Sequence, residues 1–533
     1  MSRDIEASTD PDRQRIRRVR RILHAMTAVA VLLSAAVGAE AMAASPADAP
    51  KPLSTADQEH GMRAGTPFQD PPVAETGGTR DPNLTITLDA GRSRYQISGR
   101  EVYGASYTGS YVAPTLHAEP GATVTVHLVN HLPVATNLHF HGLHVSPEGQ
   151  SDDPFLCVEP GAETTYRLAI PADHAQGTFW YHSHAMGTSC PAPGAAAMPD
   201  MGAMTGDVEN QIFAGLSGAL VVGDDRTLLP AALRHVTAHT LVLKDVQLDP
   251  AGHILQNTDT TSINSDDPTV RLVNGQLRPV LSMRPNETQL WRLANAGADI
   301  FYQLQLDGYR FTVVGEDGEP VARVTTADRL LLPPGKRYDV LVTAGAHPAR
   351  TVLRTTAYSN GPQGDAYPDT ELAAIKIAGS AVHRLPDVTG AIPTAPADLA
   401  AEPIAHRRTV DLGESADGNT FYLNGSQFAA GTPAFTTPAK VGTVEEWTIV
   451  NHSGEDHPFH LHTNAFEVLS VNGTAQPYTH RQDTVVVPHA TDGGPGNVVI
   501  RVAFADYPGK WMFHCHIAAH EDHGMMGFID VVP

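Results

Sequence analysis

Apolar and polar residues alternate along short stretches of this 533-residue chain, and one such stretch occurs three times. Residues 121–130, 286–295 and 442–451 each begin at a turn residue and end in Asn nine positions later. Alternation rich in β-branched and aromatic residues predicts a strand with one buried face. The final Asn residues lie 165 and 156 positions apart (295 − 130 and 451 − 295), so each copy is as long as a domain. The pattern predicts an all-β chain of three Greek-key β-sandwich domains.

The repeat divides the chain into three predicted domains with two segments before them. Domain 1 is expected over 82–225, domain 2 over 226–385 and domain 3 over 403–533. Residues 44–81 are rich in Pro and Gly and show little periodicity, so we expect a flexible tether there.

Residues 1–43 have the composition of a secretory signal peptide. A basic region precedes an apolar run over 22–39 and an A-x-A cleavage site at 41–43. An uncleaved membrane anchor is the alternative, but the run is Ala-rich and barely long enough to span a bilayer. We expect an exported protein, periplasmic or secreted, with no stable membrane insertion after cleavage; its paired arginines permit a twin-arginine route. The basic residues are Arg13, Arg15, Arg17, Arg18, Arg20 and Arg21.

The three copies differ where chemistry would lie. Nine and eleven residues after its final Asn, each outer copy has a His-x-His pair, whereas the middle copy has Leu304 and Leu306. A second His-x-His pair follows in each outer copy, and the middle copy has no counterpart. The four pairs are His139/His141, His182/His184, His460/His462 and His514/His516.

Each pair can act as a two-pronged clamp, because side chains at i and i+2 of a strand point to the same face. One pair alone is weak evidence, since it can satisfy hydrogen bonds or lie on the surface. Eight imidazoles at matching offsets exceed the needs of one metal ion and suit a cluster of two or three ions between domains 1 and 3. Domain 2 is expected to hold no metal and to act as a spacer.

A second kind of metal site is indicated around Cys515, which faces away from the two histidines that flank it in the chain. With His457, His520 and Met525 it completes a thiolate, two imidazoles and a thioether, the ligand set of a blue-copper electron-transfer site. Zinc is the usual rival for Cys and His but seldom accepts Met. Met526 follows directly; the spacing favours Met525 as the ligand and a packing role for Met526.

Together these motifs resemble those of the multicopper oxidases, which include laccases, bacterial cuprous oxidases and bilirubin oxidase-type enzymes. The likeness covers nearly everything after residue 82, including 273–275 and 334–340 of the middle domain. It implies three cupredoxin-like domains and four copper ions: type 1, type 2 and a binuclear type 3 pair. It implies the type 1 ligands His457, Cys515, His520 and Met525, the type 2 ligands His139 and His460, and the type 3 ligands His141, His182, His184, His462, His514 and His516.

The resemblance also indicates carboxylates that would relay protons, which reduction of O2 to water consumes. Asp152 matches the acid of the first domain, with Asp153 as a close rival, and Glu521 matches the second acid. Solvated surface carboxylates are the alternative reading of these acids. Three histidines beside the clusters lie off the motifs, and we expect supporting or ordinary polar roles for His144, His452 and His523.

The net charge and the cysteine content limit which kinds of partner and which cellular compartment are expected. A formal net charge of −22 argues against nucleic acid, whose phosphates would be repelled. In an oxidising compartment Cys157 and Cys190 can pair around His182 and His184, leaving Cys515 for metal; free thiols are the alternative.

The predicted function is that of a laccase-like enzyme that oxidises phenolic or similar small reducing substrates and uses O2. The alternative is a periplasmic cuprous oxidase, which would bind Cu(I) through thioethers; we expect only a flexible loop where such residues gather. Those residues are Met186, Met198, Met201 and Met204. A non-enzymatic cupredoxin scaffold would be expected to lose metal ligands, and none is missing here. The sequence leaves the physiological substrate and the oligomeric state open.

Overall fold

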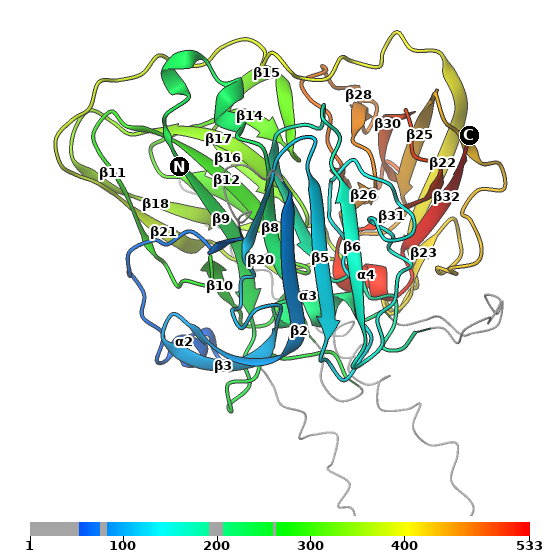
Figure 1. Ribbon diagram of the computed structural model, residues 1–533, viewed down its shortest axis with the longest axis horizontal. Coiled ribbons are helices and arrows are strands. Elements are labelled where there is room, and N and C mark those ends of the chain that lie inside the picture. Colours follow the sequence, from blue (N-terminus) through cyan, green and yellow to red (C-terminus); the bar gives the residue numbers. More distant parts are fainter. Residues whose placement is uncertain (1–52, 75–82, 191–205, 259–262) are drawn as a thin grey trace, which may run out of the picture.

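The computed structural model describes residues 53–74, 83–190, 206–258 and 263–533, and strands dominate this part of the chain (Figure 1). Three sandwiches of two sheets follow one another along the chain, which confirms the expected all-β fold. The predicted signal peptide lies outside the described residues. No helix in the part that is described is long and apolar enough to cross a membrane.

Domain 1 consists of two four-stranded sheets with the orders β1-β4-β8-β7 and β3-β2-β5-β6. A helix, α3 (Val208–Ala214), precedes the last strand. The strands are β1 (Val73–Ala74), β2 (Leu84–Ile97), β3 (Arg100–Ser106), β4 (Thr115–Ala118), β5 (Thr123–Asn130), β6 (Glu163–Ala169), β7 (Gly177–His182) and β8 (Ser217–Val222).

Domain 2 has a six-stranded sheet, β10-β9-β12-β17-β14-β15, a five-stranded sheet, β11-β21-β18-β13-β16, and a small hairpin, β19-β20. Two short 3-10 helices lead into it, η2 (Asp225–Leu228) and η3 (Ala231–Leu233). The strands are β9 (Thr237–Val246), β10 (Val270–Val273), β11 (Val280–Met283), β12 (Thr288–Asn295), β13 (Tyr302–Leu306), β14 (Phe311–Glu316), β15 (Glu319–Ala327), β16 (Arg329–Leu332), β17 (Arg337–Thr343), β18 (Ala349–Thr356), β19 (Tyr358–Ser359), β20 (Ala366–Tyr367) and β21 (Thr370–Ile377).

Domain 3 repeats this plan with the sheets β23-β22-β25-β30-β27-β28 and β24-β32-β31-β26-β29. Its helix α4 (Ala518–Asp522) packs against α3 of domain 1 (Figure 1). The strands are β22 (Ile404–Glu414), β23 (Phe421–Leu423), β24 (Ala439–Lys440), β25 (Thr443–Asn451), β26 (His457–Leu461), β27 (Phe466–Val471), β28 (Thr474–Ala475), β29 (Thr484–Val487), β30 (Gly496–Phe504), β31 (Gly509–Cys515) and β32 (Met526–Val532).

The repeated segments form equivalent strands, β5, β12 and β25. Each pairs in parallel with the first long strand of its domain (β2, β9 or β22) and antiparallel with a later one (β6, β17 or β30). The sequence repeat therefore corresponds to one topological frame used three times.

A buried Asn ends the repeated strand in every domain and anchors the loop that follows. Asn130 Nδ2 donates to the carbonyl oxygens of Val134 and Val158 at 2.9 and 2.8 Å, and its Oδ1 accepts from the amide two residues on. Asn295 and Asn451 make the same three kinds of bond. The loop therefore leaves the strand in the same way each time, so residues nine and eleven positions later reach equivalent places.

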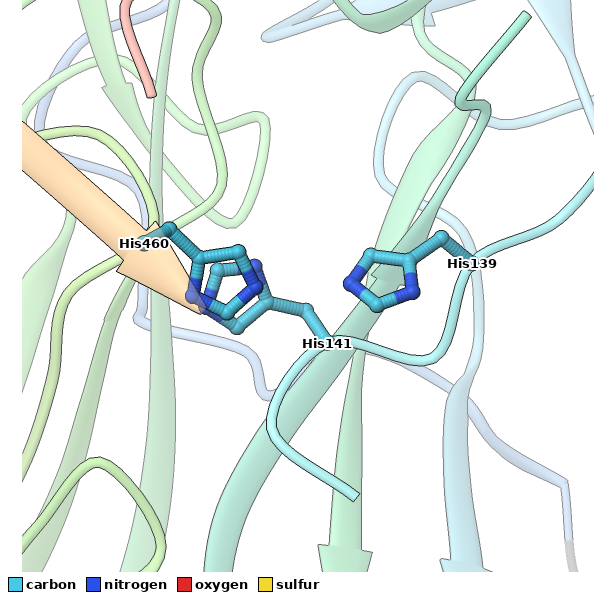
Figure 2. A group of neighbouring side chains, drawn as sticks. All are labelled: His139, His141 and His460. Carbon is cyan, nitrogen blue, oxygen red and sulfur yellow. The ribbon is translucent and has the colours of Figure 1, made fainter. Parts of the chain in front are cut away.

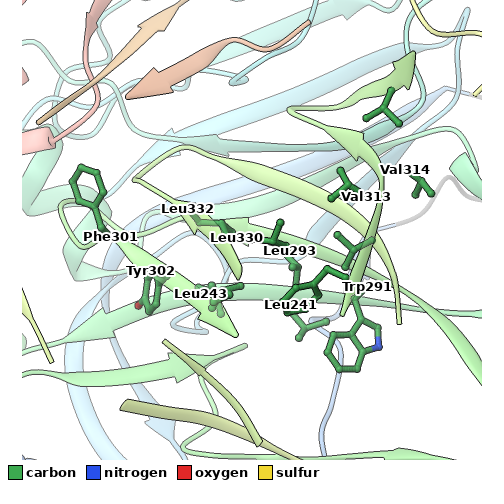
Figure 3. Packing of buried hydrophobic residues seen from close by; sticks show 14 of the residues in the cluster. Leu241, Leu243, Trp291, Leu293, Phe301, Tyr302, Val313, Val314, Leu330 and Leu332 are labelled. Carbon is green, nitrogen blue, oxygen red and sulfur yellow. The ribbon is translucent and has the colours of Figure 1, made fainter. Parts of the chain in front are cut away.

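In domain 2 these equivalent places are filled by leucine. Leu304 and Leu306 of β13 are buried in a continuous apolar core, part of which is seen in Figure 3 around Trp291 and Tyr302. Burying one leucine side chain contributes roughly 1.5–3 kcal/mol. The middle domain thus closes its core with apolar groups where the outer domains present imidazoles.

Residues 53–74 do not form the flexible tether expected from their composition. Gln58, in the short helix α2 (Thr55–Glu59), is buried and donates to the carbonyl of Pro268 at 2.6 Å. Glu59 forms an ion pair with Arg278 at 2.7 Å, and β1 pairs with β4. The partners of Gln58 and Glu59 lie 210 and 219 positions later, a separation that composition and local periodicity do not encode.

Cys157 and Cys190 form a disulfide in domain 1, as the first of the two interpretations predicted. The bridge spans 33 residues and encloses the segment that carries His182 and His184. Cys515 is the buried free cysteine.

Replacing both bridged cysteines by serine (C157S/C190S) should lower the free energy of unfolding of domain 1. The expected loss is about 3–4 kcal/mol, because the bridge restricts a 33-residue loop in the unfolded chain. Denaturant unfolding followed by circular dichroism measures the loss, and reduction of the wild-type protein should reproduce it. Equal midpoints for variant and wild type would contradict the expectation.

Candidate metal centre

The four His-x-His pairs lie where domains 1 and 3 face each other. In domain 1, His139 and His182 exchange two backbone hydrogen bonds of 2.9 and 3.0 Å, so the two pairs run side by side. In domain 3, His460 of β26 lies opposite His514 of β31. Each outer domain thus presents two adjacent His-x-His pairs to the other, and the members of three pairs (His182/His184, His460/His462 and His514/His516) belong to different sets of possible metal ligands.

The imidazoles of the two domains interleave. Figure 2 shows His139 and His141 of domain 1 beside His460, which lies at the end of a domain 3 strand. The rings of His141 and His460 stack with centroids 3.7 Å apart, and those of His139 and His462 stack at 3.8 Å. The eight rings therefore form one buried cluster between the domains.

Within the cluster, ring nitrogens gather in threes, with the atoms of each set within 4.8 Å of one another. The sets are His141, His182 and His516; His184, His462 and His514; and His139, His141 and His460. Each set draws on both outer domains. The first two sets share no member, and the third adds His139 and His460. The geometry therefore offers places for three neighbouring metal ions.

Burial favours the neutral form of His182 and His184, and the neutral imidazole is the form that binds metal ions. Burial lowers the pKa of His182 to about 3 and that of His184 to about 4. The Nε2 atoms of His139, His182 and His460 have no hydrogen-bond partner within the described ranges. A buried polar atom without a partner costs about 1–3 kcal/mol, so these donor atoms fit a site made for metal.

In four of the eight rings, the nitrogen that faces away from the cluster lies against a protein acceptor. Nδ1 of His182, His460 and His514 donates to a backbone carbonyl at 2.8–2.9 Å, and Nδ1 of His139 lies 3.1 Å from the Asp152 carboxylate. Partners of this kind fix the tautomer and the orientation of a metal-binding imidazole.

A separate set of possible ligands lies beside the cluster in domain 3. Cys515 Sγ is 3.5 Å from His457 Nδ1 and 3.7 Å from His520 Nδ1, and the two Nδ1 atoms are 3.2 Å apart. The buried Met525 is tied to this set through its backbone, which bonds to both Cys515 and His520 at 3.1 and 3.0 Å. Met526 instead begins β32 and pairs with β31.

The chemistry of this set fits copper. Burial raises the pKa of the Cys515 thiol well above its usual value, so a thiolate here needs a bound cation. One thiolate with two imidazoles is a copper-selective combination. The outer nitrogens are also supported: Ser453 Oγ lies 2.8 Å from His457 Nε2, and the Glu455 carboxylate lies 3.5 Å from His520 Nε2.

The two sites are joined through Cys515. Its neighbours in the chain, His514 and His516, belong to different three-histidine sets of the cluster. A group bound at the thiol therefore has a short bonded path to both sets.

Of the candidate acids in domain 1, Asp152 faces the cluster and Asp153 does not. Asp152 is buried against His139. The Asp153 carboxylate accepts hydrogen bonds from the amides of Gly149 and Phe155 and so supports the local turn. The surface alternative is therefore wrong for Asp152.

Glu521 is buried as well, with its carboxylate oxygens 3.2 Å from His184 Nε2 and 3.0 Å from His514 Nδ1. It touches the cluster from α4, on the domain 3 side. The surface alternative is wrong for this residue also.

Sequence reasoning missed Asp483 and Arg337, which also reach the cluster. Asp483 Oδ1 lies 3.0 Å from His141 Nε2, and Arg337 donates to both oxygens of Asp483 at 2.8 and 2.6 Å. Burial opposes ionisation, but Arg337 and His141 hold the pKa of Asp483 well below its usual range. Arg337 lies in the segment 334–340 that resembles the family's middle domain, but that likeness assigned it no role, and Asp483 belongs to no motif.

The histidines off the motifs belong to none of these metal-binding sets. His144 lies 2.9 Å from the carbonyl of Thr463, and His452 forms a pair with Asp411 on the surface. His523 contacts a carbonyl of α4. Met198, Met201 and Met204 lie outside the described residues.

Comparison with known proteins gives matches in all three domains. Residues 89–199, 235–376 and 403–533 match three family models described as multicopper oxidase. A multicopper oxidase of Staphylococcus aureus is 27% identical over 458 residues, which cover 84% of this chain and 88% of the relative. A laccase of Bacillus subtilis is 26% identical over 498 residues, which cover 80% and 89%.

Solved structures share the fold. A multicopper oxidase from Campylobacter jejuni, described as a metallo-oxidase, has a TM-score of 0.74 at 24% identity over 91% of this chain and 98% of its own. A laccase-like multicopper oxidase from an Ochrobactrum species has a TM-score of 0.68 at 23% identity over 87% and 100%. Because family matches occur in all three domains of this cupredoxin-like frame, the chain belongs to the multicopper oxidase family, copper-dependent oxidoreductases that use O2.

Proposed function

We propose that this enzyme is laccase-like, removing one electron at a time from a phenolic or similar small substrate and reducing O2 to water. The observation that carries the proposal is the position of Cys515. Its thiol belongs to one donor set, while its neighbours His514 and His516 belong to the cluster. Electrons accepted at the first site therefore have a bonded route to the second.

The proposal assigns four copper ions to these donors. Bound copper supplies the one-electron steps and the centre where O2 is reduced. The type 1 ligands are His457, Cys515, His520 and Met525; the type 2 ligands are His139 and His460; the type 3 pair is held by His141, His182 and His516 and by His184, His462 and His514. The short distances among the His and Cys ligand atoms support the assignment.

His520 is the proposed point of electron entry. It is 7% exposed, whereas His457, Cys515 and Met525 are 0% exposed. A reducing substrate that docks at this edge can transfer an electron without binding copper directly, which suits phenols and aromatic amines. The Glu455 carboxylate and Phe421, whose ring stacks on His520 at 4.0 Å, would orient that edge.

Asp152 and Glu521 are the proposed proton relays. Four-electron reduction of O2 to water also consumes four protons, so acids beside the cluster are needed. Asp152 contacts the cluster from domain 1 and Glu521 from domain 3. Their burial against the imidazoles supports this role over that of surface charges.

The proposed location is outside the cytoplasm, after removal of residues 1–43, with a twin-arginine route permitted. The Cys157–Cys190 disulfide supports an oxidising compartment. Residues 82–225 and 403–533 would hold the copper ions, and residues 226–385 none. The expected partners are a small reducing substrate and O2, and no nucleic acid.

The copper-loaded enzyme should oxidise a phenolic dye at the same rate with and without free copper added. The four bound ions suffice if the substrate itself donates the electrons. Initial rates measured after dialysis against buffer, and again with added copper salt, test this. Strict dependence on added copper would instead indicate a cuprous oxidase.

Cys515→Ser should abolish the blue colour and substrate oxidation, because a hydroxyl does not replace the thiolate as copper ligand. The eight cluster imidazoles are unchanged, so copper at that cluster should remain. Visible spectra and metal analysis, with electron paramagnetic resonance for the type 2 signal, measure both. Retained blue absorbance would refute the type 1 assignment.

Asp152→Asn should slow reoxidation of the reduced enzyme by O2 by about 10²-fold, because the amide cannot pass a proton. Blue absorbance and copper content should be preserved. Asp153→Asn is the matched control, since that carboxylate bonds only turn amides, and it should react with O2 at nearly the wild-type rate. Stopped-flow reoxidation compares the two; equal rates in both variants would remove Asp152 from the relay.

A further inference from the structure

The middle domain reaches the copper cluster through one turn. Residues 333–336 join β16 to β17, and Gly335 in this turn has a φ of +85°. A Cβ atom at Gly335 would lie 2.8 Å from Cδ2 of His516 and 3.0 Å from Cε1 of His141. Only glycine combines this backbone conformation with so close an approach. The turn therefore forms a wall of one three-histidine set.

Arg337, directly after this turn, joins all three domains. Its side chain is completely buried. Nη1 and Nη2 donate to the two oxygens of Asp483 in domain 3, and Nε donates to the carbonyl of Thr178 in domain 1 at 3.2 Å. Nη1 also donates to the carbonyl of Gly335 at 2.9 Å. A planar guanidinium can satisfy these acceptors together, and an ammonium group cannot.

Asp483 transmits this contact to two histidines of different domains. Its carboxylate accepts from His141 Nε2 at 3.0 Å, and its backbone carbonyl accepts from His460 Nδ1 at 2.9 Å. These two rings are stacked on each other. One residue therefore sets the orientation of the stacked pair at the domain boundary.

The backbone around Asp483 is also held by the middle domain. Asp317 accepts hydrogen bonds from the amides of Asp483 and Thr484 at 3.2 and 3.1 Å. Lys336 donates to Asp317 at 2.9 Å and to the carbonyl of Thr484 at 3.0 Å. The position of Asp483 thus depends on contacts from domain 2 at both side chain and backbone.

His141 differs from its neighbours in the nitrogen that faces the cluster. A carboxylate can only accept, so the contact with Asp483 requires the proton on Nε2 of the neutral ring. That leaves Nδ1, which lies 3.1 Å from His516 Nε2, as the unprotonated nitrogen that can coordinate a metal ion. In His182, His460 and His514 the roles are reversed, because Nδ1 bonds to the backbone.

We propose that the copperless middle domain is a positioning element of the trinuclear centre: Arg337, acting through Asp483, fixes the His141 tautomer that presents Nδ1 to copper. Arg337 and Asp483 are positioning residues, and neither belongs to one of the sets of possible metal ligands. The proposal rests on the copper assignment given above. It gives domain 2 a role beyond spacing the outer domains.

Arg337→Lys in the copper-loaded enzyme tests the proposal, because lysine keeps the charge but not the paired hydrogen bonds. We expect O2 consumption to fall about 10–100-fold, as for other residues that support metal ligands. The near-ultraviolet absorption of the coupled type 3 pair should lose at least half its intensity, and the type 2 resonance signal should shift. Blue absorption from the type 1 site should remain at the wild-type level.

Arg408→Lys is the matched control. Arg408 makes a buried, two-bond contact with Glu445 in domain 3, as Arg337 does with Asp483, but Glu445 bonds to Trp447 and to no histidine. Both variants should lower the melting temperature. Only Arg337→Lys should change the type 2 and type 3 signals. If the two variants lose stability alike and both keep these signals, the positioning role is overturned.

If the R337K protein does not accumulate, Asp483→Asn provides a second test of the proposal. The amide has the same size but no charge, so the contacts to Arg337 and His141 are weakened and the same spectral losses are expected. Intact type 2 and type 3 signals in D483N would also overturn the proposal. A wild-type protein that binds no copper would instead contradict the proposed function itself. Failure of the positioning proposal and failure of the proposed function are therefore distinguishable.

Discussion

The stacking of imidazoles across the boundary between domains 1 and 3 is the contact on which the rest of the structure depends. Neutral, buried rings leave nitrogen atoms without partners, and each such atom costs about 1–3 kcal/mol. The three clear cases alone, Nε2 of His139, His182 and His460, amount to roughly 3–9 kcal/mol, a large part of the net stability of a protein. Copper binding offsets this cost, so metal loading and the assembly of the domains are linked.

The repeated frame explains how one strand pattern serves both a metal site and an apolar core. Asn130, Asn295 and Asn451 hold their loops by equivalent hydrogen bonds. Residues nine and eleven positions after each Asn therefore lie in equivalent places in every domain. What differs is the side chain at those positions. Leucines complete the core of domain 2, whereas histidines in the outer domains must find a partner beyond their own sandwich.

The sequence predicted those features that depend on local order in the chain. The offset from the repeated Asn identified the pairs His139/His141 and His460/His462. All eight histidines reach the cluster, although only His182, His460 and His514 lie inside strands, so strand alternation alone does not account for their positions. The sequence could not decide which of Asp152 and Asp153 faces the cluster, because the direction of each side chain depends on the conformation of the turn that carries both. The long-range contacts of Gln58 and of Arg337, whose partner Asp483 lies 146 positions away, had no local pattern at all. The tether prediction was wrong over residues 53–74 for the same reason.

Burial also separates the two half-reactions. The eight cluster imidazoles are at most 1% exposed, so a substrate as large as a phenol has no access to them. In the proposed assignment, the ligand with the largest exposed fraction is His520, at 7%, and it belongs to the other site. In the proposed assignment, electrons would pass from the outer site to the cluster through Cys515 and the histidines next to it in the chain. In the proposed arrangement, buried protein separates the reductant from the centre that reduces O2, so docking of the reductant need not alter the geometry in which O2 reacts.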